Sequence, residues 1–122
     1  MKIPIFPLNG AILFPKTNLP LNIFEQKYVD MVDYSLSNQR FIGMVQQKEN
    51  NKLYNVGCYG KITVFNETPD KRYLINLEGI SCFKIIRKIE TGRKFIICEI
   101  EIFDNFNDPN LEDGLKLKIL DS

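Results

Sequence analysis

The stretch LYNVGCYGKITVFNETPDKRYLINLEGISCFKIIRKI, residues 53 to 89, determines the fold class. Apolar and polar residues alternate through much of it, and this period of two is typical of a β-strand. The segment TPDK (68–71) interrupts the alternation with residues that favour a tight turn. The stretch therefore predicts two antiparallel strands that are joined as a hairpin.

Further strand candidates lie on both sides of this hairpin. Turn-like segments, KENNK (48–52) and ETGR (90–93), separate it from apolar runs with the same period. These runs are KIPIF (2–6), NLPLNIF (18–24), RFIGMVQQ (40–47) and KFIICEIEIF (94–103). Such short strands predict a mainly β fold, either an antiparallel meander or a closed barrel.

Two features refine this prediction. Pro20 lacks a backbone N–H donor, which places its strand at an edge of the sheet or places the proline at a strand's start. Gly57, Gly60 and Gly79 interrupt strands, and a glycine inside a strand marks a bulge or a sharp bend. A small barrel needs such bends at its corners.

One segment has the period of a helix. In FEQKYVDMVDYSLSNQ (24–39), apolar or small residues recur at steps of three and four, while Asp30 and Asp33 lie on the other side. The recurring residues are Tyr28, Met31, Val32, Ser35 and Leu36. We expect one amphipathic helix over about residues 25–38, with Asn38 as a plausible stop.

The N-terminal stretch PLNGAILFPKTNLPLNIFE (7–25) is apolar, yet it is neither a signal peptide nor a membrane anchor. Its longest apolar run is AILF (11–14), whereas a signal peptide needs roughly 7 to 15 apolar residues and a transmembrane helix about 20. Its prolines exclude a helix. We expect a structured wrap against the barrel, with a tight turn at Asn9-Gly10.

The composition suits one compact globular domain. The chain has 122 residues, of which 44% are hydrophobic, and a net charge of +1 that does not demand a polyanionic partner. Cys58, Cys82 and Cys98 are widely spaced inside apolar runs. They match neither a disulfide framework nor a metal knuckle, so we expect buried free thiols in a reducing, cytoplasmic setting.

Catalytic and metal-binding readings find little support. The chain contains no histidine, the commonest general base and metal ligand. Glu99 and Glu101 are spaced roughly 6 to 7 Å apart along a strand, as an inverting glycosidase pair could be, but alternating glutamates usually form a solvated face. The acidic segment DNFNDPNLEDG (104–114) fails the EF-hand pattern. We predict no catalytic residue, metal or cofactor.

The C-terminal residues 105–122 form a polar linker followed by the start of a helix. Asp108 is placed to cap it, and Pro109 suits its first position. We expect this helix to be the beginning of a helical lobe that the 122 residues cut short, after a domain over residues 1–104.

A basic hairpin raises nucleic acid as an alternative partner. Five cations cluster beside Phe95, a ring on which a base could stack. They are Lys84, Arg87, Lys88, Arg93 and Lys94. Because Glu90 lies among them and the net charge is near zero, a solvated hairpin tip is the favoured interpretation.

Some aromatic and apolar residues alternate with the inward-facing residues of their strands and so should point outward. Such outward side chains predict a protein-binding surface. Ile96, Cys98, Ile100 and Ile102 form one inward face, and Val56, Cys58, Ile62 and Val64 form another. The tentative binding residues are Phe14, Tyr59, Phe65, Phe95 and Ile97. The alternative is that the helix at 25–38 or a missing C-terminal lobe covers them.

The chain resembles the N-terminal domain of the Lon protease family in five motifs that occur in the same order. These are IPIFPLNGAILFP (3–15), LPLNIFE (19–25), FIGMVQQ (41–47), VGCYGKI (56–62) and RYLINLEGISCFKI (72–85). The resemblance implies a PUA-like β-barrel with one packed helix. It also implies a role in engaging polypeptide substrates or protein partners and in assembly, with self-association left open.

The same resemblance implies what the chain does not carry. It has no GxxxxGK[ST] phosphate loop and lacks the length for the Ser–Lys peptidase domain, so we expect a stand-alone, non-catalytic bacterial form. Family members often have glycine where this chain has Lys71 and arginine where it has Cys82. These two departures weaken the case for a conserved polar site there.

Overall fold

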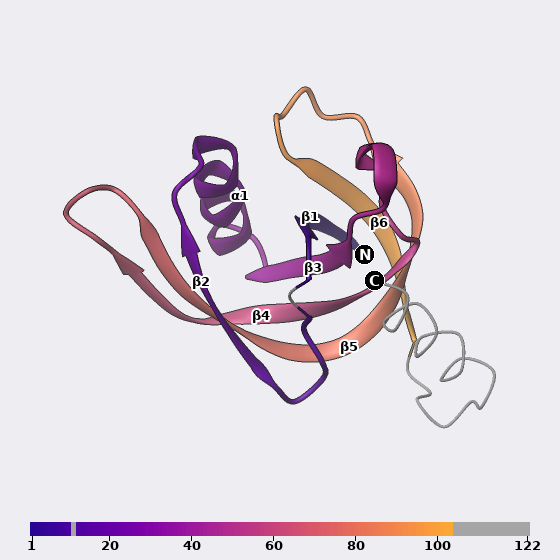
Figure 1. The fold of residues 1–122 in the computed structure, drawn as a ribbon, viewed down its shortest axis with the longest axis horizontal. Coiled ribbons are helices and arrows are strands. Elements are labelled where there is room, and N and C mark those ends of the chain that lie inside the picture. The colour runs from indigo at the N-terminus through magenta and orange to yellow at the C-terminus, as the bar shows by residue number, and fades with distance from the viewer. Residues whose placement is uncertain (11, 104–122) are drawn as a thin grey trace.

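The computed structural model describes residues 1–10 and 12–103 (Figure 1). The predicted mainly β fold with one packed helix is confirmed. The elements are β1 (Lys2–Leu8), β2 (Asn18–Ile23), α1 (Gln26–Leu36), β3 (Phe41–Gln46), the short 3₁₀ helix η1 (Glu49–Asn51), β4 (Val56–Glu67), β5 (Tyr73–Ile89) and β6 (Ile96–Phe103). The predicted C-terminal linker and helix lie outside the described residues.

Five of the described strands close into a ring. β1 pairs with β3, β3 with β4, β4 with β5, β5 with β6, and β6 pairs again with β1. The β1–β3 pair is parallel, so the expectation of a purely antiparallel meander is wrong for these two strands. A parallel pair needs a long crossover connection, which β2 and α1 supply here.

β2 lies outside the ring, against the first part of β5. Its pairs run from Asn18 opposite Glu78 to Ile23 opposite Tyr73. Because β5 is its one partner among the described strands, β2 is an edge strand, as predicted from Pro20. β5 is 17 residues long; its residues 73–84 pair with β4, residues 73–78 also pair with β2, and residues 82–89 pair with β6 (Figure 1).

The N-terminal strap, defined as residues 9–10 and 12–17, crosses β5 at Gly79. The Lys16 N–H donates to the Gly79 carbonyl at 2.8 Å, and the Gly79 N–H donates to the Thr17 carbonyl at 2.8 Å. Leu13 of the strap is buried in an apolar cluster with residues of the sheet. The predicted wrap is thus confirmed, and backbone hydrogen bonds as well as apolar contact hold it.

α1 packs on the outer face of the ring with its predicted apolar side. Its buried residues are Val29, Met31, Val32 and Ser35. The Asn38 side-chain amide donates to the Tyr34 carbonyl at 2.6 Å, and Arg40 has a positive φ of 67°. The chain therefore leaves the helix after Leu36, close to the predicted stop. No helix in the described part of the chain is long and apolar enough to cross a bilayer.

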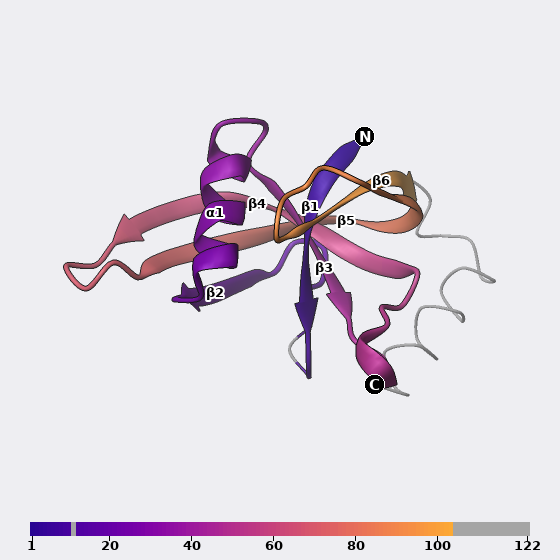
Figure 2. The same ribbon diagram turned by 90° about the horizontal axis from the view of Figure 1, so that it is seen from above.

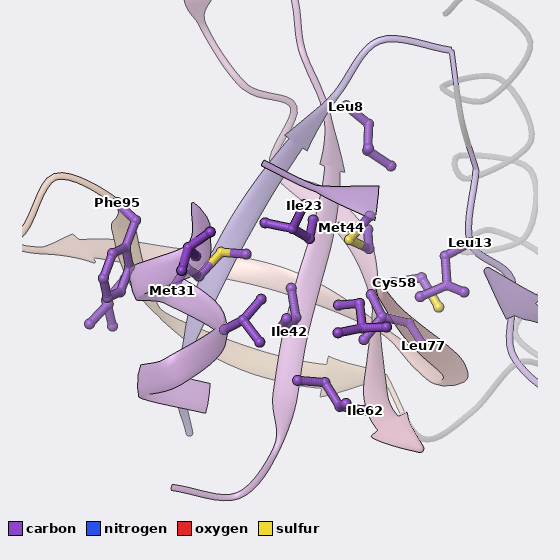
Figure 3. Close-up of a cluster of buried hydrophobic side chains, with 14 residues drawn as sticks. Leu8, Leu13, Ile23, Met31, Ile42, Met44, Cys58, Ile62, Leu77 and Phe95 are labelled. Carbon is purple, nitrogen blue, oxygen red and sulfur yellow. The ribbon is translucent and has the colours of Figure 1, made fainter. Parts of the chain in front are cut away.

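Two apolar clusters occupy opposite sides of the strands. One fills the ring and draws on all five ring strands; its buried members are Ile3, Ile5, Val45, Tyr59, Phe83, Cys98 and Ile100. The other lies outside the ring, under α1, β2 and the strap (Figure 3). Figure 3 shows Met31 of α1 and Ile42 and Ile62 of the sheet in this outer cluster. Strands of the ring are therefore covered on both faces.

Because both faces of the strands are covered, one prediction of which side chains point into the ring is wrong. Cys98 and Ile100 point into the ring, as expected for β6. In β4, however, Cys58 and Ile62 belong to the outer cluster while Tyr59 points into the ring. A register shift between Tyr59 and Gly60 accompanies this arrangement and confirms the irregularity predicted at Gly60.

Candidate functional site

The predicted protein-binding residues separate into an exposed pair and a buried trio. Phe14 and Phe65 are 45% and 38% exposed. Tyr59, Phe95 and Ile97 are only 6%, 5% and 3% exposed, so the expectation that they lie on an accessible surface is wrong. A binding role for Phe14 and Phe65 stays a prediction.

The buried trio has identifiable neighbours. Tyr59 packs inside the ring against Phe41, with ring centroids 5.4 Å apart. Phe95 packs against Tyr34 of α1 at 5.6 Å, so the alternative that the helix covers it is confirmed. The sequence did not reveal this, because apolar residues such as Tyr59 and Ile97 also occur on the face that carries polar residues, and alternation alone does not show which face is covered.

Exposed apolar side chains instead gather at the end of the β4–β5 hairpin. We define the hairpin apex by four residues, Phe24, Val64, Phe65 and Leu74, which are 69%, 51%, 38% and 41% exposed. Phe24 belongs to this end because the preceding residue, Ile23, pairs with Tyr73 at the start of β5. Viewed from above, the hairpin extends well beyond α1 and β2 (Figure 2).

The hairpin apex is apolar on both faces. Phe65 lies opposite the buried Ile75 and contacts the Tyr73 ring, with centroids 4.8 Å apart. Val64 and Leu74 are opposite Asn76 and Asn66, on the other face of the ribbon. A projecting two-stranded ribbon with apolar side chains on each face has accessible surface that a partner can cover.

One edge of the same ribbon is open to pairing. β3 pairs with β4 from Phe41 opposite Lys61 to Met44 opposite Cys58, and the Ile62 N–H donates to the Arg40 carbonyl. Beyond Ile62, β4 has β5 as its sole partner among the described strands. This edge can accept an added strand, the geometry by which many domains bind extended peptides.

The turn of the hairpin is held by a local polar network. The Thr68 hydroxyl is hydrogen-bonded to the Asp70 carboxylate, and Arg72 pairs with Asp70 at 2.8 Å. The Thr68 hydroxyl and the Arg72 charge hold the pKa of Asp70 below its usual range. Tyr73 then donates to the Asp33 carboxylate of α1 at 2.9 Å, which ties the base of the hairpin to the helix.

A polar cleft of about 1140 Å³ lies between α1 and the β5–β6 loop. Its α1 wall carries Asp30 and Asp33, and its loop wall carries Arg93 and Lys94. The Arg93 guanidinium stands 4.9 Å from the centroid of the Tyr34 ring at the cleft. With opposite charges on its two walls, the cleft favours neither an anionic nor a cationic partner.

The basic hairpin considered for RNA lacks an accessible stacking ring. Phe95 is buried, and Arg93 already lies over Tyr34 and Phe95. The Arg87 guanidinium pairs with Glu99 at 2.7 Å and keeps the pKa of that carboxyl low. Lys84, Lys88 and Lys94 are exposed. The structure thus supports the solvated interpretation, and RNA binding stays an untested alternative.

The structure places the glutamates and cysteines that were weighed for catalysis. Glu99 is committed to Arg87, and Glu101 lies opposite Lys84 in the β5–β6 register. All three cysteines are free and buried, as expected. Within the described ranges, no three His, Cys, Asp or Glu side chains gather as a metal site would require. The acidic segment at 104–114 lies outside those ranges.

Sequence reasoning missed three of the four residues of the hairpin apex. Val64 was expected to point inward, but the register shift between Ile62 and Val64 turns it outward. Phe24 and Leu74 sit at element boundaries, where period gives little guidance. A signal was present in the strands' lengths, because β4 and β5 are both longer than β2, β3 and β6 and must project beyond them.

Comparison with known proteins identifies the family. Residues 2–120 match the model of the ATP-dependent protease La (LON) substrate-binding domain. The chain is 29% identical over 119 residues to Lon protease of Buchnera aphidicola subsp. Acyrthosiphon pisum, covering 90% of this chain and 15% of that protein. It is 24% identical over 102 residues to Lon protease of Escherichia coli, covering 78% and 13%. The chain thus spans only 13–15% of the length of these two relatives.

Solved structures agree on the fold. A Lon N-terminal domain protein from Xanthomonas campestris superposes with a TM-score of 0.70 at 22% identity, covering 99% of this chain and 72% of that one. The N-terminal domain of Mycobacterium avium complex Lon protease gives 0.73 at 11% identity, covering 97% and 63%. The ring of strands, the helix and the family match lead to one conclusion: the chain belongs to the Lon substrate-binding domain family.

Proposed function

We propose that this domain binds unfolded polypeptide through the hairpin apex. The observation that carries the proposal is the gathering of Phe24, Val64, Phe65 and Leu74 on a projecting ribbon. The family's substrate-binding description supports polypeptide as the ligand. Apolar side chains of an extended segment would cover these residues, and the hydrophobic effect would supply most of the affinity.

Hydrogen bonds between backbones would also determine how a bound segment aligns with β4. The β4 edge beyond Ile62 offers main-chain groups to an incoming strand, which binds without regard to sequence, while the apex residues select for apolar side chains. Exposed charges at the turn, Asp70 and Arg72, would form a polar rim. Such a surface suits broad recognition of apolar segments more than recognition of one specific motif.

A chemical-shift titration tests this proposal. The isotope-labelled domain is titrated with an unstructured peptide rich in Phe, Leu and Val, and with a control peptide in which Ser replaces these residues. We expect saturable shifts in residues 62–76 with the first peptide only. Shifts that centre on residues 84–94, obtained with single-stranded RNA and not with peptide, would favour the nucleic-acid alternative.

Substitutions locate the surface. Phe65→Ser and Leu74→Ser should each weaken peptide binding several-fold. Ile86 is a matched control, since it is an apolar β5 residue that is 54% exposed but lies in the part of β5 paired with β6. Equal affinity of the wild type and the Phe65 and Leu74 variants, or equal loss in Ile86→Ser, would show that binding does not use the hairpin apex.

A further inference from the structure

Two cysteines face each other across the β4–β5 ladder. Cys58 of β4 is directly opposite Cys82 of β5, and opposite residues of an antiparallel pair project to the same face. Both line a cavity of about 60 Å³, which Leu13 and Phe14 of the strap also line. Figure 3 shows Leu13 and Cys58 on this side of the sheet. The two side chains are 5% and 9% exposed.

The hydrogen bonds of the ladder determine the type of this pair. The Ile85 N–H donates to the Asn55 carbonyl at 2.7 Å, which makes Asn55 and Ile85 a hydrogen-bonded pair. Hydrogen-bonded and non-hydrogen-bonded pairs alternate along an antiparallel ladder. Counting along the ladder from residues 55 and 85, the pair of Cys58 and Cys82 is of the non-hydrogen-bonded type.

The other side of β4 gives the same answer. The Ile62 N–H donates to the Arg40 carbonyl at 2.9 Å, and alternation from that pair makes Met44 and Cys58 a hydrogen-bonded pair. The main-chain groups of Cys58 therefore face β3 and not β5. In non-hydrogen-bonded pairs the Cα atoms are about 4.5 Å apart, within the range of about 4.4–6.8 Å that disulfides span.

The two thiols also differ in acidity. The neighbouring Cys82 thiol and burial raise the pKa of the Cys58 thiol, whereas the neighbouring Cys58 thiol lowers the pKa of Cys82. Cys82 is also the more exposed of the two, at 9% against 5% for Cys58, so it is the thiol that peroxide reaches first. Cys98, by contrast, is buried inside the ring opposite Lys88 of β5, and burial raises its pKa.

We propose that Cys58 and Cys82 form a redox modification site, at which hydrogen peroxide converts the two thiols into a cross-strand disulfide. The Cys82 sulfur attacks one peroxide oxygen; the S–O bond forms, the O–O bond breaks and water leaves, giving a sulfenic acid. The Cys58 sulfur then attacks the Cys82 sulfur, the S–S bond forms, and a second water leaves. Two thiols and one peroxide yield one disulfide and two waters, so two electrons pass to the peroxide.

The surroundings favour this oxidant. A cavity of about 60 Å³ admits molecules of the size of water or hydrogen peroxide but not a bulky disulfide such as oxidised glutathione. The strap residues beside the cavity would limit access further. The bond would close a loop of residues 58–82, which contains Val64, Phe65 and Leu74 of the hairpin apex, so oxidation would tie the two strands together at the base of the projecting ribbon.

Peptide mapping of the native domain tests this proposal without any substitution. Trypsin cleaves after Lys and Arg, and so separates the cysteines into peptides 53–61, 73–84 and 95–116. After peroxide treatment of the folded domain and alkylation, we expect loss of two of the three thiols and a linkage between peptides 53–61 and 73–84. Dithiothreitol should restore all three thiols.

Serine variants test the order of steps. Cys58→Ser should leave a sulfenic acid on Cys82 that dimedone traps, Cys82→Ser should give little trapping, and Cys98→Ser should form the disulfide like the wild type. Circular dichroism checks that each variant is folded. A linkage to peptide 95–116, intermolecular linkage alone, or three intact thiols in the treated native domain would overturn the proposal.

Discussion

Gly79 of β5 lies directly against the main chain of Phe14 in the strap. A Cβ placed on Gly79 would stand 1.9 Å from the Phe14 carbonyl oxygen, far inside van der Waals contact. The two backbone hydrogen bonds that Gly79 makes to Lys16 and Thr17 require this close approach. Glycine at this position therefore allows the strap to lie flat on β5.

We expect Gly79→Ala to release the strap or to distort β5. Overpacking of this kind costs about 1–3 kcal/mol or more, because the obstructing atoms are backbone and cannot rotate away. Denaturant unfolding measures the loss. Glu78→Ala, at the exposed neighbouring residue, is the control and should change stability by about 0.5 kcal/mol or less. Equal stability of Gly79→Ala and the wild type would show that the strap shifts at no cost.

Lys71 at the hairpin turn adopts a left-handed conformation, with φ of 65°. This backbone costs a non-glycine residue about 1–2 kcal/mol, whereas glycine pays about 0.5–1 kcal/mol in unfolded-state entropy. Lys71→Gly should therefore stabilise the domain by about 0.5–1 kcal/mol, measured by thermal or denaturant unfolding. Lys71→Ala removes the same side chain without relieving the strain and should bring no gain.

The contact between Tyr73 and Asp33 should make one tyrosine resistant to ionisation. The hydrogen bond to the Asp33 carboxylate, with burial, raises the pKa of Tyr73 from about 10 to about 12. Because the folded-state pKa is the higher one, the contact stabilises the domain fully below about pH 10, and this contribution is lost as the pH rises through about 12.

Ultraviolet titration of tyrosinate checks this expectation. The high-pH component should disappear in Tyr73→Phe and shift to lower pH in Asp33→Asn, which keeps an acceptor but removes the charge. At neutral pH, Tyr73→Phe should cost at most about 1 kcal/mol, because the contact is exposed. A titration curve of Tyr73→Phe that retains the component near pH 12 would assign it to another tyrosine.

Phe95 and Phe65 should respond to substitution in opposite ways. Phe95 is 5% exposed against Tyr34, so Phe95→Ala should destabilise the domain by about 3–5 kcal/mol. Phe65→Ala should cost about 1 kcal/mol or less, since its ring is partly exposed and contacts Tyr73. Unfolding and peptide-binding measurements on both variants separate the two roles. Strong destabilisation by Phe65→Ala would make the hairpin apex part of the core.

The sequence by itself determined the local structure and the family. Period-two runs around Gly60 and Gly79 marked the long strands, and the three- and four-residue steps from Tyr28 to Leu36 marked the helix, because side-chain direction along a strand or helix depends on neighbouring residues alone. The prolines of the N-terminal stretch excluded helix there through their fixed φ. The ordered motifs from residue 3 to residue 85 pointed to the Lon family, which the family match confirms.

Only the tertiary structure decided which apolar faces are covered and which residues become neighbours. Tyr59, Phe95 and Ile97 looked like surface residues because one face of a strand is normally solvated, but the ring buries one face and α1, β2 and the strap cover the other. The meeting of Cys58 with Cys82 depends in turn on the β4–β5 register. Closure and register arise from contacts between residues far apart in the chain, and the alternation within each strand is compatible with several of them.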